Sequence, residues 1–120
     1  MLDKLTLLAL TQQYYKLWEN KDIDNIKNMF SKDIVLIDPV VKRIEGLSSV
    51  LKVNENIFNS CITIRIIEMN VFVDQFSDTT IGEVKFFDDR RLIEVVDIFS
   101  FDGKSKINKI VAYLDTKYIR

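Results

Sequence analysis

The sequence contains no histidine, and this absence excludes more kinds of chemistry than any other feature of its composition. Without histidine there is no Ser-His-Asp or Cys-His catalysis, no histidine general base and no histidine-ligated metal. Cys61 is the only cysteine, which excludes an internal disulfide and a cysteine-rich zinc site. Proton transfer, if the protein performs it, therefore depends on Asp, Glu, Tyr, Lys or the single thiol.

An excess of charge and a long apolar run are also missing. The net charge is −1 with both signs mixed along the chain, so the sequence predicts binding neither to nucleic acid nor to a membrane surface. No apolar run approaches the roughly 20 residues that a membrane span needs. Residues 7–10 are apolar, but their flank is not positive and no cleavage-type site follows, which favours a helix over a signal peptide. We expect a cytoplasmic protein.

The apolar pattern predicts helices first and strands afterwards. A length of 120 residues is about one domain, so we expect residues 1–120 to form one unit. Helical spacing of apolar residues predicts helices over residues 3–20 and 22–30 and a third over residues 47–58, for which Ser48 is a candidate cap. Asp22 can cap the second helix, which residues 31–33 close.

From Cys61 onward the apolar period changes to two. This period predicts strands over residues 62–73, 79–87, 92–101 and 106–114, in addition to a short strand over residues 34–38. The apolar phase flips after Ile66, as a β-bulge would produce, and Gly82 marks a possible bend. Helices that precede a run of hairpin-linked strands indicate an α+β fold.

Asp38 is the first candidate for chemistry. Four apolar residues lead into it, and the only proline of the chain, Pro39, follows at once. Because proline cannot donate a ladder hydrogen bond, the strand ends there or lies at a sheet edge. A carboxylate in this position could act as a base in an apolar pocket. It could also start a turn and accept hydrogen bonds from its own backbone.

Asp97 is the second candidate, because it interrupts the apolar face of the strand over residues 92–101. Burial would raise the pKa of this carboxyl group, and a neutral carboxyl can donate a hydrogen bond to an oxyanion. The alternative is a structural pair with Arg65, Arg43 or a lysine. Tyr14, beside Tyr15 on the first helix, could donate a hydrogen bond or simply pack in the core.

Together these residues resemble the bacterial ketosteroid isomerases of the NTF2-like, SnoaL-like superfamily. The resemblance rests on Tyr14-Tyr15, the helix start at residues 22–26, Phe30, Asp33, residues 38–40, Gly46, residues 97–101 and Gly103. It implies a cystatin/NTF2-like cone with three N-terminal helices packed in a curved antiparallel sheet. It further implies a homodimer that forms through outer sheet faces, for which the strands over residues 79–87 and 92–101 are candidates.

The resemblance also implies roles for the candidate residues. Asp38 would be the general base that moves a proton next to a carbonyl, while Tyr14 and Asp97 would hold the enolate oxygen. The family also places a supporting tyrosine on the third helix, whereas residues 53–57 of this chain contain none. This difference argues against a steroid as the specific substrate. The resemblance then implies a small hydrophobic molecule in an internal pocket. It implies no cofactor and no metal.

Two other functions remain open at the level of sequence. One is a non-catalytic ligand-binding or dimerisation module that uses the same pocket. The other is hydrolysis assisted by Arg65 and two aspartates, which requires Arg65 to point inward. The alternation along residues 62–66 places Arg65 opposite the apolar side chains and argues against this. The polar stretch over residues 88–91 is predicted to be a solvated turn.

Overall fold

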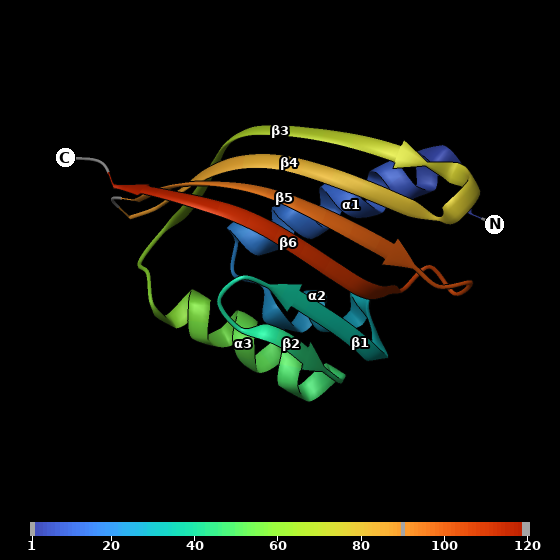
Figure 1. Ribbon diagram of the computed structural model, residues 1–120, viewed down its shortest axis with the longest axis horizontal. Helices are drawn as coiled ribbons and strands as arrows, with labels where there is room; N and C mark the ends of the chain where they lie inside the picture. The colour runs from blue at the N-terminus through green and yellow to red at the C-terminus, as the bar shows by residue number, and fades with distance from the viewer. Residues whose placement is uncertain (1, 90, 119–120) are drawn as a thin grey trace.

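The computed structural model describes residues 2–89 and 91–118, which form three helices and a six-stranded sheet (Figure 1). In chain order the elements are α1 (Lys4–Glu19), α2 (Ile23–Met29), β1 (Phe30–Asp38), β2 (Lys42–Glu45), α3 (Leu47–Asn59), β3 (Ile64–Asp74), the 3-10 turn η1 (Gln75–Ser77), β4 (Thr79–Asp88), β5 (Arg91–Phe101) and β6 (Ile107–Tyr118). The predicted α+β class is confirmed.

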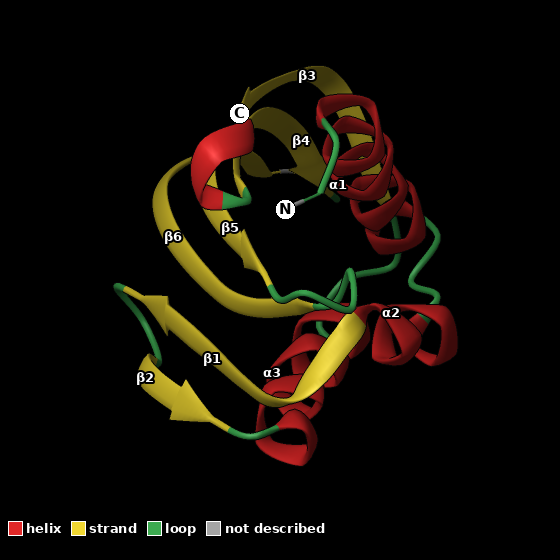
Figure 2. Ribbon diagram, turned by 90° about the vertical axis from the view of Figure 1, so that its right-hand side faces the viewer, coloured by secondary structure: helices red, strands yellow, loops and turns green. Residues whose placement is uncertain are grey.

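The strands are ordered β2-β1-β6-β5-β4-β3, and every neighbouring pair is antiparallel except β1 and β6. The sheet is therefore mixed, whereas the sequence predicted an antiparallel one. The difference arises because β6, at the end of the chain, pairs with β1 in the same direction. The sheet curves around one side of the molecule, and the three helices lie along its concave side (Figure 2).

The helices begin where the sequence supplies caps. The carboxylate of Asp3 accepts the N–H of Leu5 at 2.9 Å, and that of Asp22 accepts the N–H of Asn25 at 3.2 Å. The prediction that Ser48 caps the third helix is wrong, because α3 begins one residue after Gly46. Gly46 has φ of +93°, a backbone conformation that side chains disfavour.

Two strand details test the predicted pattern. Residues 31–33 were predicted to close the second helix, but they lie within β1. The reason is tertiary, because Phe30 is buried and pairs with Ile107 of β6, which draws this segment into the sheet. The predicted bulge is confirmed by a register shift between Ile66 and Glu68 in β3.

The core and the open part of the cone occupy opposite ends of the strands. Fully buried side chains lie near the start of β4 and β6, the end of β5 and the start of α1; they include Leu7, Thr80, Phe99 and Ile107. There the hydroxyl groups of Thr11 and Thr80 form a hydrogen bond of 2.8 Å between α1 and β4. The other halves of the same strands are left to enclose a cavity.

Candidate active site

A cavity of about 400 Å³ lies between the concave face of the sheet and the helices α1 and α3. Its wall is mostly apolar, with contributions from β1, β4, β5 and β6. The polar groups in the wall are few: Tyr14, Tyr15, Asp38, Asn54, Asn56, Asp88, Arg91 and Asp97. An apolar cavity of this size with a few convergent polar groups is typical of a site for a small organic molecule.

The structure places all three sequence-predicted residues, Tyr14, Asp38 and Asp97, in the wall of this one cavity. Asp97 of β5 is level with Ala112 of β6, and Asp38 follows Ile37, which pairs with Val111. Asp38 and Asp97 therefore lie in one row across the sheet with Ala112 between them. Two strand spacings separate their backbones, which is about 10 Å. The small side chain of Ala112 leaves room between the two carboxyl groups.

Asp97 is buried, with 9% of its surface exposed, and its Oδ2 accepts a 2.7 Å hydrogen bond from the hydroxyl of Tyr15. Burial raises the pKa of Asp97 to about 7. The hydrogen bond from Tyr15 opposes this rise, and the negative charge of Asp38 adds to it. Below neutral pH the carboxyl group of Asp97 is thus neutral and able to donate a hydrogen bond. Among the side chains that the structure describes, no arginine or lysine forms a hydrogen bond or an ion pair with Asp97.

The two tyrosines lie side by side on α1 and have different surroundings. Both rings pack edge-on against Phe99, with centroid separations of 5.2 Å for Tyr14 and 5.7 Å for Tyr15. Only Tyr15 reaches Asp97, whereas the hydroxyl of Tyr14 has no hydrogen-bond partner in the described part of the chain. Burial and the negative charge of Asp97 raise the pKa of both hydroxyls, so both keep their protons at neutral pH.

Gly82 explains how Tyr15 reaches Asp97. The ladder runs through Gly82 without a register shift, and Gly82 pairs directly with Asp97. A Cβ atom at this position would lie 2.1 Å from the Tyr15 hydroxyl oxygen. The missing side chain is therefore the space that the tyrosine hydroxyl occupies.

We expect Gly82→Ala to lower the free energy of unfolding by about 1–3 kcal/mol, as overpacking of a core does. Tyr15 would have to move away from Asp97, and its ring is confined by Tyr14 and Phe99. Urea denaturation measures the change. Gly103→Ala is the matched control, because a Cβ atom there meets nothing within 4 Å. Equal unfolding midpoints for the two variants would contradict the role assigned to Gly82.

Asp38 forms a backbone turn and also lies in the cavity wall. Its Oδ1 accepts the N–H of Val40 at 2.8 Å and that of Val41 at 2.7 Å, so the carboxylate does bond its own backbone. It also lines the cavity, and its Oδ2 has no hydrogen-bond partner among the described residues. The turn holds the carboxylate by one oxygen, which leaves the second oxygen able to accept a proton.

The stretch over residues 88–91 differs from the solvated turn that was predicted. Asp88 is buried with 4% exposure and lines the cavity together with Arg91. Its carboxylate binds the Arg91 guanidinium at both oxygens, with 2.9 Å between Nε and Oδ1. The burial of Asp88 could have been predicted from the alternation along β4, because Val84, Phe86 and Asp88 share one face. Arg65, by contrast, is exposed over the ring of Phe87 and does not line the cavity.

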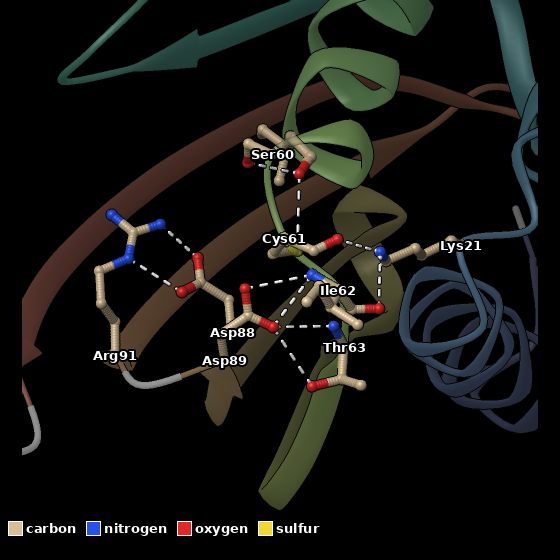
Figure 3. A network of polar contacts seen from close by, with 9 residues as sticks. Lys21, Ser60, Cys61, Ile62, Thr63, Asp88, Asp89 and Arg91 are labelled. Atoms are coloured by element: carbon tan, nitrogen blue, oxygen red, sulfur yellow. Dashed lines mark hydrogen bonds and ion pairs between the residues drawn. The ribbon is translucent and has the colours of Figure 1, made fainter.

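Asp89, in the turn between β4 and β5, binds the segment of chain between α3 and β3 (Figure 3). Its carboxylate accepts the N–H groups of Thr63 and Ile62, which hold the pKa of Asp89 below its usual range. Lys21 donates to the carbonyl oxygens of Cys61 and Ile62 from the other side. These bonds fix the end of α3 against the wall that carries Asp88 and Arg91.

Other kinds of site were also sought within residues 2–89 and 91–118. In that part of the chain no three side chains of Asp, Glu or Cys are grouped as a metal would require. None of the described helices is both long enough and apolar enough to cross a membrane.

Solved structures with this fold include proteins with different activities and proteins of unknown function. A steroid delta-isomerase from Pseudomonas aeruginosa is 15% identical, with a TM-score of 0.72, and the match covers 95% of this chain and 82% of that one. The epoxide hydrolase/cyclase-like enzyme SalBIII, linked to pyran ring formation in the polyether salinomycin, is 20% identical with a TM-score of 0.80, over 96% and 95% of the chains. An NTF-2 like protein of unknown function from Burkholderia xenovorans LB400 is 13% identical with a TM-score of 0.77, over 98% and 88%.

At these identities the structural matches show the fold alone. No curated protein matches the sequence. The family model described as SnoaL-like domain, however, matches residues 11–110, which include Tyr14, Tyr15 and the three aspartates of the cavity wall. The chain therefore belongs to the SnoaL-like family.

Proposed function

We propose that the protein is an isomerase or cyclase-like enzyme that moves a proton next to the carbonyl group of a small hydrophobic substrate. The observation that supports this most is the row of Asp38, Ala112 and Asp97 across one apolar cavity. It provides an available carboxylate oxygen on one side and a carboxyl group with a pKa of about 7 on the other. These are the two groups that enolisation needs, a base and a hydrogen-bond donor.

In the proposed reaction, Oδ2 of Asp38 takes a proton from the carbon next to the carbonyl. The electron pair of that C–H bond moves into the new C=C bond and leaves negative charge on the carbonyl oxygen. Neutral Asp97 and the hydroxyl of Tyr14 donate hydrogen bonds to this oxygen, and these bonds strengthen as charge develops. Asp38 then returns this proton, or one exchanged with solvent, to the same or another carbon of the system, so no cofactor is consumed.

Tyr15 has a positioning role in this scheme. Its hydroxyl already donates to Oδ2 of Asp97, so it is not the donor for the substrate. By holding that oxygen, Tyr15 orients the carboxyl group so that its other oxygen can carry the proton that faces the substrate. The neighbouring Tyr14 has the unpartnered hydroxyl and takes the donor role that the resemblance implies.

The alternative is a non-catalytic ligand-binding module with the same cavity. Deuterium exchange at the carbon next to the carbonyl of β,γ-unsaturated ketones, followed by NMR, distinguishes the two functions. We expect the protein to accelerate this exchange on at least one ketone in a panel that extends from single rings to fused rings. A module would bind such ketones without exchange. The hydrolytic function is not supported, because Arg65 lies outside the cavity.

We also propose that the protein forms a homodimer through the convex face of the sheet. An apolar row crosses five strands there, as the strand register shows for Phe72, Ile81, Ile98, Val111 and Ile37. Phe72 is 58% exposed and Ile81 is 37% exposed. A continuous apolar band marks an interaction surface, and two copies related by a twofold axis can bury it against itself.

Ile81→Lys is expected to convert the dimer to a monomer, because it places a charge within this apolar row. Light scattering coupled to size-exclusion chromatography measures the mass. Phe76→Lys is the control, since Phe76 is also exposed but lies in η1, outside the row. A monomeric wild type, or a dimer that survives Ile81→Lys, would contradict the assignment.

A further inference from the structure

Asn54 places an amide in a surface that is otherwise apolar. Val50, Asn54 and Phe58 are the buried residues of α3 and follow one another at intervals of four, which puts them on one face of the helix. Asn54 is 5% exposed and lines the cavity beside Val53 and Ile57. Residues 53–57 contain no tyrosine, and the polar Asn54 on this apolar helix face is a signal that is visible in the sequence.

The amide of Asn54 has no hydrogen-bond partner in the described part of the chain. Its Nδ2 is buried without one, and no hydrogen bond to its oxygen is formed there either. Within residues 2–89 and 91–118 the same condition applies to one other side-chain atom, Oδ1 of Asn108, which does not line the cavity. Asn54 is therefore the place where an unpartnered buried amide and the cavity coincide.

The amide of Asn54 gains no hydrogen bond from the surrounding side chains or backbone, so packing alone does not account for its place on this helix face. A buried donor that loses its hydrogen bonds to water costs free energy, and a leucine of similar shape would not carry that cost. The cost is recovered when a ligand places an oxygen next to the amide. The amide can rotate about its last single bond, so it can donate to a carbonyl oxygen or bond to a hydroxyl.

Asn54 and the Tyr15–Asp97 pair belong to different walls of the cavity. Helix α3 packs on β1 and β2, whereas Tyr15 lies on α1, which packs on β3 and β4, and Asp97 lies on β5. A ligand that hydrogen-bonds to both walls would do so with two oxygen atoms, joined by an apolar frame that fits the rest of the wall.

We propose that Asn54 is a specificity-determining residue that binds a second oxygen of the substrate. The substrate class is then an apolar carbonyl compound with a further hydroxyl or carbonyl group, and not a hydrocarbon ketone with a single oxygen. This inference rests on the proposed function, because it concerns the substrate of the same cavity. It adds the second oxygen and the residue that recognises it.

Fluorescence titration with naphthols tests the inference without a known substrate. 2-Naphthol presents one oxygen on an sp² carbon, as an enolate does, and the dihydroxynaphthalene isomers add a second oxygen at different positions. We expect at least one isomer to bind wild type about 3- to 10-fold more tightly than 2-naphthol, the size of one added hydrogen bond. Asn54→Leu should abolish this gain and leave the affinity for 2-naphthol unchanged. Asn59 is an exposed residue of α3 outside the cavity wall, so Asn59→Leu should retain the tighter binding of the dihydroxynaphthalene isomer.

A gain that persists in Asn54→Leu, or no isomer that binds wild type more tightly than 2-naphthol, would overturn the inference. Asn54→Ala gives the same comparison if the leucine variant does not fold. Thermal unfolding without ligand adds an independent result, because loss of an unpartnered amide should leave the melting temperature unchanged or raised, whereas a marked fall would show a structural role. Failure of the proposed function has a separate signature, which is absent ketone exchange with the naphthol preference intact.

Discussion

Asp38→Asn is expected to lower the rate of ketone proton exchange by about 100- to 10,000-fold, the range over which a positioned general base contributes. The asparagine side chain keeps an oxygen that can accept the N–H groups of Val40 and Val41, so the turn after β1 should persist. What the variant loses is the carboxylate oxygen that would accept the proton. Deuterium incorporation followed by NMR measures the rate for both proteins.

Asp33→Asn is the matched control for this experiment. Asp33 lies on the same strand, is exposed and does not line the cavity. It should exchange ketone protons at the wild-type rate. If wild type is no faster than Asp38→Asn on every ketone of the panel while 2-naphthol still binds, the non-catalytic module is the better description.

Asp97→Asn is expected to change how stability depends on pH. The pKa of Asp97 is about 7 in the folded protein and 3.8 for an ordinary aspartate. Between these values the folded state holds a proton that the unfolded state has lost, so the contribution of Asp97 to stability decreases as pH rises from about 4 to about 7. The full difference is on the order of 4 kcal/mol. Asparagine does not titrate, so the stability of the variant relative to wild type should increase over this range.

Urea denaturation of both proteins at about pH 4.5 and about pH 8 measures this change. Asp24→Asn, at an exposed position on α2, should show no such trend relative to wild type. A stability difference between Asp97→Asn and wild type that is the same at both pH values would mean that Asp97 does not titrate in this range.

The same titration should appear in catalysis. If neutral Asp97 donates to the enolate oxygen, wild-type exchange should decrease as pH rises above about 7, because the carboxylate formed there cannot donate. An amide can donate at every pH, so Asp97→Asn should be slower than wild type below pH 7 and should lack this decrease.

Much of the fold followed from local pattern. Helical spacing before residue 60 and a period of two afterwards predicted the α+β class, and the phase flip at Ile66 predicted the bulge in β3. Both patterns reflect which side chains become buried on folding, and the spacing of those side chains can be read directly from the sequence. The predictions were wrong where pairing with a distant strand decided the outcome, as for residues 31–33, which joined β1 beside β6.

The candidate site was predictable in its residue types. A carboxylate before the only proline, and another on an apolar strand face, pointed to Asp38 and Asp97, and the resemblance added Tyr14. The sequence could not tell which of the two tyrosines reaches Asp97, because both lie near the same helical stripe. Asp88 was predicted to lie in a solvated turn, but it is buried and binds Arg91 in the cavity wall.

Composition set the kinds of chemistry open to this protein, because a chain without histidine must move protons with carboxyl, hydroxyl, lysine or thiol groups. How those groups come together depends on the folded chain. Tyr15 and Asp97 are 82 residues apart and bond because β4 carries no side chain at Gly82, where the tyrosine hydroxyl lies. Such a contact depends on strand register and on the space between layers, which emerge only when the whole sheet has formed around the cavity.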